Sequence, residues 1–210
     1  MTRAHIAALA LLAVIGTAAG AQETARVAVA PDSKLWIDGT SNLHAWTCKA
    51  EKLTATIDFD AANAAVVGTA PTKSMKRVEV KVPVKSLKCG HGAMDDNLYK
   101  ALGADDSSQI SYVLSTFEAA PGETKTTFTL RTVGTLTVAG KTNSITMDVV
   151  ATRLGDGTVK ATGTVPIKMS DYGIKPPTAI FGTLKTGNDV KVNFELSVGS
   201  AAIATALREP

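Results

Sequence analysis

Apolar and polar residues alternate strictly along several segments of the chain. In KRVEVKVPVKSL every second residue from Val78 to Val84 is valine, and the residues between are mostly charged. This is the pattern of a half-buried strand. The alternation recurs in KLTATIDF, TTFTLRTVGTLTV, NSITMDVVAT, TVKATGTVPIKM and DVKVNFELSV. Adding KLWIDGT, LHAWTC and QISYVLSTFE gives about eight strands, which are separated by glycine-rich turn signals.

One segment shows a helical period instead. Met94, Leu98 and Leu102 recur at four-residue spacing before Gly103, which predicts a helix from Ala93 to Leu102. The chain has no repeat of strand, helix and strand, so a doubly wound parallel sheet is excluded. Long amphipathic strands joined by short connections must close on themselves to hide their apolar faces. We therefore expect an all-β fold, an antiparallel eight-stranded lipocalin-like barrel with this short helix between the third and fourth strands.

The inward positions of these strands are mostly small. They are rich in Val, Ala, Gly and Thr, and aromatic residues make up only 5% of the chain. An eight-stranded barrel is just wide enough to be filled by side chains or to hold one small ligand. Small apolar walls suit a long aliphatic ligand, whose burial contributes about 0.8 kcal/mol per methylene group. The alternative is a filled barrel that acts as a surface interaction module.

The amino-terminal segment has the features of a secretory signal. Arg3 precedes the apolar run from Ile6 to Ile15, and small residues from Ala19 to Ala21 match a cleavage site. We expect residues 1–21 to be a signal peptide that is removed near Ala21, and residues 22–210 to form one domain. The apolar run is shorter than the about 20 residues that span a bilayer, and no later segment comes close. The expected location is periplasmic or secreted, with no transmembrane segment in the mature chain.

Charge and motifs exclude several classes of protein. The formal net charge is only +3, and the lysines are scattered singly, so nothing suggests a nucleic-acid partner. The chain has no Gly-x-Ser-x-Gly elbow, and its histidines have no evident orienting partner. The sequence thus predicts a protein that is not an enzyme, with no catalytic residue, no cofactor and no bound metal.

The two cysteines, Cys48 and Cys89, could form a disulfide or contribute to a metal site. In an exported protein an even pair of thiols favours a disulfide, so we expect these two to be bonded. His44 and His91 lie close to them in sequence, and two Cys with two His could bind zinc tetrahedrally. The spacings match no known zinc finger. The alternative function is a metal- or redox-active exported protein that uses His44, Cys48, Cys89 and His91.

Several phrases together resemble a known family. These are WIDGTSNLHAW, VEVKVPVKSLKCGHGAMDDNLYKAL, VGTLTVAGKTNSITMDV, GTVPIKMSDYGIKPP and VKVNFELSV, which cover the chain from Lys34 to Val198. The chain resembles the YceI-like family, exported bacterial proteins with a lipocalin-like barrel whose characterised members bind polyisoprenoid lipids. The phrase KMSDYGI is similar to the Arg-Ser-Asp-Phe-Gly-Ile phrase of that family, with Tyr172 in place of Phe.

The resemblance implies a hydrophobic tunnel through the barrel, closed in part by the helix from Ala93 to Leu102. The implied ligand is a polyisoprenoid or another long-chain lipid. We chose candidate wall residues by their inward parity on a strand or their place on the apolar face of the helix. They are Leu43, Trp46, Phe59, Val80, Val82, Leu98, Ile110, Tyr112, Leu130, Val165, Ile167 and Phe194.

Overall fold

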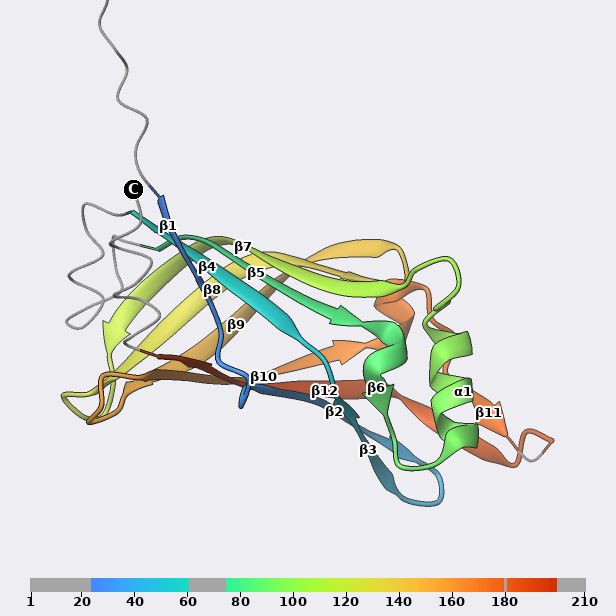
Figure 1. The fold of residues 1–210 in the computed structure, drawn as a ribbon. Coiled ribbons are helices and arrows are strands. Elements are labelled where there is room, and N and C mark those ends of the chain that lie inside the picture. The colour runs from blue at the N-terminus through green and yellow to red at the C-terminus, as the bar shows by residue number, and fades with distance from the viewer. Residues whose placement is uncertain (1–23, 61–74, 180, 200–210) are drawn as a thin grey trace, which may run out of the picture.

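The computed structural model describes residues 24–60, 75–179 and 181–199 (Figure 1). The expected signal peptide therefore lies outside the described residues. The strands are β1 (Thr24–Ala28), β2 (Lys34–Ser41), β3 (Ala45–Ala50), β4 (Thr54–Asp60), β5 (Met75–Pro83), β6 (Leu87–Lys88), β7 (Gln109–Pro121), β8 (Thr127–Val138), β9 (Lys141–Arg153), β10 (Val159–Lys168), β11 (Thr178–Ala179) and β12 (Leu184–Val198). The helices are α1 (Gly92–Ala101) and the short 3₁₀ turns η2 (Val84–Ser86) and η3 (Met169–Tyr172).

The strands form one antiparallel sheet that curls into a half-barrel (Figure 1). Its order is β1-β4-β5-β7-β8-β9-β10-β12-β2-β3-β6, and β11 pairs with β12 outside this path. Half of the neighbouring pairs in the path are strands that follow each other in the sequence. The pairing of β2 with β12 brings together strands from near the two ends of the described chain. Figure 1 places α1 and β11 together at one end of the half-barrel.

The prediction of an all-β antiparallel fold is confirmed, but the count of eight strands is wrong. The described residues contain twelve strands, and α1 follows the sixth strand rather than the third. The strands that the sequence patterns did not include are β1, with five residues, and β6 and β11, with two each. A strand of two residues is too short to display alternation, so its pairing depends on distant neighbours and not on local pattern.

The helix agrees with its sequence prediction to within one residue at each end. Its carboxyl end is followed by Gly103 in the left-handed conformation, with φ of 60°. Glycine adopts this conformation at little cost, which explains why the helix stops there. At the amino end His91 takes the N-cap position without a side-chain capping bond.

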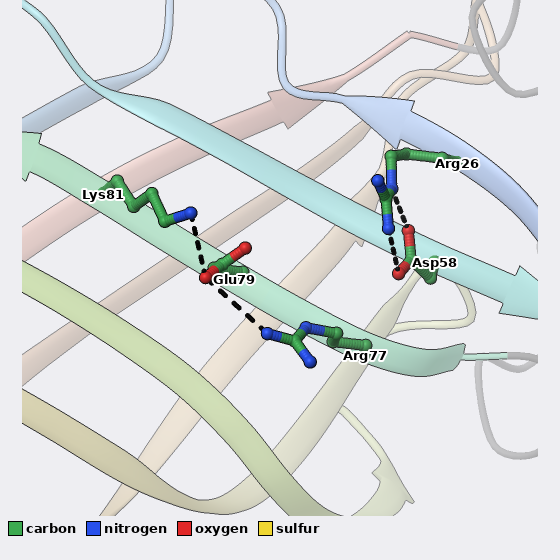
Figure 2. A network of polar contacts seen from close by, with 5 residues as sticks. All are labelled: Arg26, Asp58, Arg77, Glu79 and Lys81. Carbon is green, nitrogen blue, oxygen red and sulfur yellow. Dashed lines mark hydrogen bonds and ion pairs between the residues drawn. The ribbon is translucent and has the colours of Figure 1, made fainter.

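The side chains of β5 alternate between the two faces of the sheet. Val78 and Val80 line the interior. Glu79 lies on the outer face, where its Oε1 atom is 3.6 Å from a terminal nitrogen of Arg77 and 3.0 Å from Lys81 Nζ (Figure 2). These two ion pairs hold the pKa of Glu79 below its usual range, chiefly through the hydrogen bond from Lys81. The outer face is thus charged where the inner face is apolar.

Candidate functional site

An elongated cavity of about 380 Å³ lies inside the half-barrel. Its wall is formed by β2 to β5, β7 to β10, β12 and α1, and is almost entirely apolar. Among the described residues that line the cavity, Arg153 is the only one of the types Lys, Arg, Asp and Glu. The volume falls in the range of about 300 to 1,000 Å³ that is typical of small-molecule sites. This cavity argues against the alternative of a barrel that is filled by side chains.

Eleven of the twelve candidate wall residues line this cavity. They are Trp46, Phe59, Val80, Val82, Leu98, Ile110, Tyr112, Leu130, Val165, Ile167 and Phe194. Inward parity predicted this placement for the strand residues, because side chains alternate between the two faces of a strand, and Leu98 was predicted from its place on the apolar face of the helix. Their contact with a ligand stays a prediction.

Leu43 is the candidate that lies outside the wall. Its side chain is 72% exposed in the turn between β2 and β3. The Ser41 hydroxyl accepts hydrogen bonds from the backbone N–H groups of Leu43 (3.2 Å) and His44 (3.1 Å). This local turn ends the alternation that the prediction extended through Leu43.

Three aromatic rings of the wall occupy the space above glycines on neighbouring strands. Trp46 lies opposite Gly39, and Phe194 opposite Gly163, in the strand register. Tyr112 covers Gly134, where an added Cβ would lie 2.5 Å from its hydroxyl oxygen. Because these glycines have no side chain, the rings pack against the wall there. The small residues noted in the sequence thus make room for large ones.

Other wall residues were not among the candidates. Leu35, Ile37, Met147 and Val149 continue the same alternation on their strands, so the signal was present in the sequence. Tyr172 and Ile174 also line the cavity, but they follow β10 in η3 and the loop after it. These two positions follow neither the period of a strand nor that of a helix. The phrase KMSDYGI was the one available signal for them.

The disulfide between Cys48 and Cys89 is present, which confirms the expected pairing. It joins β3 to the segment that enters α1, and both cysteines line the cavity. Asp95 in the first turn of α1 accepts a hydrogen bond of 2.7 Å from the backbone N–H of Cys89. Its carboxylate also lies 3.3 Å from Lys88 Nζ. The bond from Cys89, followed by Lys88, lowers the pKa of Asp95.

A second attachment holds α1 against the barrel. The Tyr99 hydroxyl lies 3.0 Å from the Lys85 carbonyl and 2.8 Å from the Leu87 carbonyl, both of which accept hydrogen bonds. Leu98, one residue earlier, lines the cavity. The polar and covalent attachments thus fix the helix so that its apolar face closes part of the cavity.

The metal alternative loses its sulfur ligands in this structure. Both thiols are consumed by the Cys48–Cys89 bond, and a site of two Cys and two His would need them as thiolates. His44 and His91 are exposed, and His44 Nδ1 lies 2.8 Å from the backbone carbonyl of Ala45. Within residues 24–60, 75–179 and 181–199, no three His, Cys, Asp or Glu side chains form a metal-binding group.

The sequence of this chain matches a known protein family. A family model described as the YceI-like domain matches residues 34–198. The chain belongs to the YceI-like family. No protein of curated function matches its sequence. Within the described residues, no helix is long and apolar enough to cross a membrane.

Solved structures with the same fold include BcnA of Burkholderia cenocepacia, which is 20% identical in sequence and has a TM-score of 0.63. The match covers 80% of this YceI-like chain and 98% of the BcnA chain. A polyisoprenoid-binding domain from Saccharophagus degradans, implicated in plant cell wall breakdown, is 15% identical and has a TM-score of 0.60. That match covers 83% of this chain and 98% of the other. The YCEI protein of Campylobacter jejuni is 20% identical and has a TM-score of 0.53, and the match covers 73% of this chain and 84% of the other.

Proposed function

We propose that this protein holds a polyisoprenoid or a similar long apolar molecule inside its half-barrel and carries out no reaction on it. The observation that carries the proposal is the elongated cavity with its nearly continuous apolar wall. Each methylene group that leaves water for such a wall contributes about 0.8 kcal/mol, so a long chain gains affinity with its length. The similar Saccharophagus degradans structure is a polyisoprenoid-binding domain, which supports the same class of ligand.

We also propose that the protein works outside the cytosol, in the periplasm or after secretion. The signal-like start of the chain supports export. The disulfide supports it independently, because structural disulfides persist in oxidising compartments.

Native mass spectrometry of the purified protein, followed by organic extraction, tests the proposal. A carrier is expected to retain a lipid adduct that leaves on extraction and reappears when a polyisoprenoid is added back. A bound metal ion would support the metal-dependent alternative instead. A protein that carries no lipid and takes up none on incubation would contradict the carrier function.

Two adjacent valines on β9 provide a matched pair of variants. Val149 lines the cavity and is 7% exposed, whereas Val150 points outward and is 45% exposed. Val149→Phe places a larger side chain in the cavity and is expected to weaken lipid uptake. Val150→Phe adds the same volume on the outer face and is expected to leave uptake unchanged. Equal uptake by both variants would show that the lipid binds elsewhere.

A further inference from the structure

Two large apolar side chains are exposed on loops at the α1 end of the half-barrel. Among the described residues, the exposed large apolar side chains are Leu43, Val150, Leu154 and Phe181. Leu43 lies in the turn between β2 and β3, and Phe181 lies in the loop between β11 and β12. Figure 1 shows this turn, β11 and α1 at the same end of the half-barrel. Leu43 is 72% exposed, and the ring of Phe181 is fully exposed.

Hydrogen bonds join these two loops to each other. Asn42 Nδ2 donates to the Thr183 carbonyl at 2.8 Å, and the Lys185 N–H donates to Asn42 Oδ1 at 2.9 Å. The Asn42 N–H also donates to the Lys185 carbonyl at 3.0 Å. Leu43 directly follows Asn42, and Phe181 lies two residues before Thr183. The two apolar side chains therefore belong to one bonded surface.

The cavity reaches solvent beside these loops. Most residues of its wall are buried or half-buried, but His44, Asn97 and Thr178 line the cavity and are also exposed. They belong to the β2–β3 turn, α1 and β11, respectively. Arg153, at the last position of β9, is the fourth exposed residue of the described wall. The cavity thus has a mouth at the α1 end, and Leu43 directly precedes one of the residues that form it.

The turn that carries Phe181 does not account for an aromatic residue. Phe181 and Gly182 both have left-handed backbone conformations, with φ of 53° and 85°. Glycine or asparagine is the usual residue in this conformation, because a larger side chain is strained there. Within the described residues Phe181 thus serves neither the turn nor the core, and its ring is available to an apolar partner.

The charge of the two loops favours an anionic partner. Residues 41–47 and 175–187 contain Lys175, Lys185 and His44 but no Asp or Glu. Both lysines are exposed. The charges of α1 and of the adjacent Lys88 sum to zero, since they comprise two aspartates and two lysines. Lysines beside exposed apolar side chains are typical of proteins that bind the surface of an anionic bilayer.

We propose that the α1 end of the protein docks on a lipid bilayer that contains anionic phospholipids. Leu43 and Phe181 insert at the boundary between headgroups and acyl chains, and Lys175 and Lys185 contact the anionic headgroups. The cavity mouth then faces the bilayer, so an apolar molecule passes between membrane and cavity with less exposure to water. This inference extends the proposed function, but docking needs no lipid in the cavity and is tested without one.

Flotation of the purified protein with lipid vesicles tests the docking. One set of vesicles holds equal parts of phosphatidylcholine and phosphatidylglycerol, a second set holds phosphatidylcholine alone, and neither contains a polyisoprenoid. The wild type is expected to bind the mixed vesicles more tightly. Leu43→Ser and Phe181→Ser are each expected to weaken this binding by about fivefold or more, because each removes an apolar side chain from the interface. Replacing both Lys175 and Lys185 with Gln is expected to weaken binding to the mixed vesicles alone, by about tenfold.

Val150→Ser and Leu154→Ser supply the matched controls, because they remove the other two exposed apolar side chains, on β9 and directly after it. Both are expected to leave vesicle binding unchanged. All four positions are exposed, so the melting temperatures are expected to stay close to that of the wild type. Equal losses of binding in all four serine variants would overturn docking through the α1 end.

Two further outcomes would also overturn the docking. A wild-type protein that retains a lipid in native mass spectrometry but does not float with either set of vesicles would remove the docking and leave the carrier function intact. Self-association that is lost in Leu43→Ser and Phe181→Ser, without any flotation of the wild type, would assign this surface to a second copy of the chain.

Discussion

The ring of Phe194 covers Gly163, the residue directly opposite it on the neighbouring strand β10. A Cβ added at Gly163 would lie 2.5 Å from Phe194 Cζ and 3.3 Å from the backbone carbonyl oxygen of Asp148. The ring is the movable partner, and the cavity beside it is the available space. A side chain at Gly163 is therefore expected to push Phe194 into the cavity.

Gly163→Ala is expected to weaken lipid binding more than it weakens the fold. Overpacking costs about 1 kcal/mol or more when no space is available, but here the ring can move. If the displaced ring excludes two methylene groups of the lipid, affinity falls by about tenfold. Binding titrations and thermal melts of the same preparation check the two effects separately.

Gly155 provides the control for this substitution. A Cβ at Gly155 would meet no atom within 4 Å, so Gly155→Ala is expected to leave binding unchanged. Combining Gly163→Ala with Phe194→Leu removes the ring that clashes and is expected to recover part of the affinity lost in the single variant. Additive losses in the double variant would contradict the steric explanation.

Reduction of the Cys48–Cys89 disulfide is expected to destabilise the protein. The bond closes a loop with a sequence separation of 41 residues. The chain-entropy estimate for such a loop is about 4 kcal/mol, which corresponds to a fall in melting temperature of about 10 °C for a domain of this size. Thermal melts with and without reductant measure the effect.

The variant in which both cysteines are replaced by alanine serves as the reference for this experiment. It is expected to melt at the temperature of the reduced wild type and to be insensitive to reductant. If the wild type melted at the same temperature under both conditions, the disulfide would not contribute to stability.

The interior face of the long strands could be predicted from the sequence because a strand has a side-chain period of two. Val80, Val82, Val165 and Ile167 all follow this period and line the cavity. The full strand count could not be predicted in this way. Strand β6 exists because its two residues pair with Lys49 and Ala50 of β3, far away in the sequence.

The polar features of the cavity were harder to predict. Tyr112 was identified through its strand parity, but nothing in the sequence indicated that its hydroxyl has no partner. That property depends on where the neighbouring strands place their side chains, which no local pattern in the sequence reports. Tyr172 becomes part of the wall through the tertiary placement of η3, which no local period reports.

Asp95 is expected to make stability depend on acid pH. Its pKa is lowered in the folded protein, chiefly by the backbone N–H of Cys89 and then by Lys88. The unfolded chain binds the proton more readily, so the stabilisation is complete above the ordinary aspartate pKa of about 3.9 and is lost as pH falls through the lower folded value. Melting temperatures between pH 7 and pH 2.5 measure this loss.

Two variants separate the contribution of Asp95 from that of other carboxyl groups. Asp95→Asn is expected to melt below the wild type at pH 7, with the difference shrinking below about pH 4. Asp96→Asn removes the same charge from an exposed neighbour and is expected to follow the wild-type curve. A constant difference between Asp95→Asn and the wild type at every pH would contradict an electrostatic role for Asp95.

The edge strand β1 is expected to depend on one ion pair with β4. Arg26 lies opposite Asp58 in the register and donates two hydrogen bonds to its carboxylate, from Nε at 2.6 Å and from a terminal nitrogen at 2.9 Å (Figure 2). These bonds lower the pKa of Asp58. In the described sheet β1 pairs with β4 alone, so its amides are protected by this one neighbour.

Asp58→Asn is expected to accelerate hydrogen exchange of the β1 amides several-fold while leaving the amides of β8 and β9 unchanged, because loss of the pair loosens the edge and not the centre of the sheet. High salt is expected to produce a smaller effect of the same sign in the wild type, since Arg26 is largely exposed and its charge is screened. Lys160→Gln breaks the comparable pair with Glu195 at the β10–β12 boundary and serves as the control. Equal acceleration in β1 by both variants would show that loss of any surface ion pair, and not the Arg26–Asp58 contact, controls the edge strand.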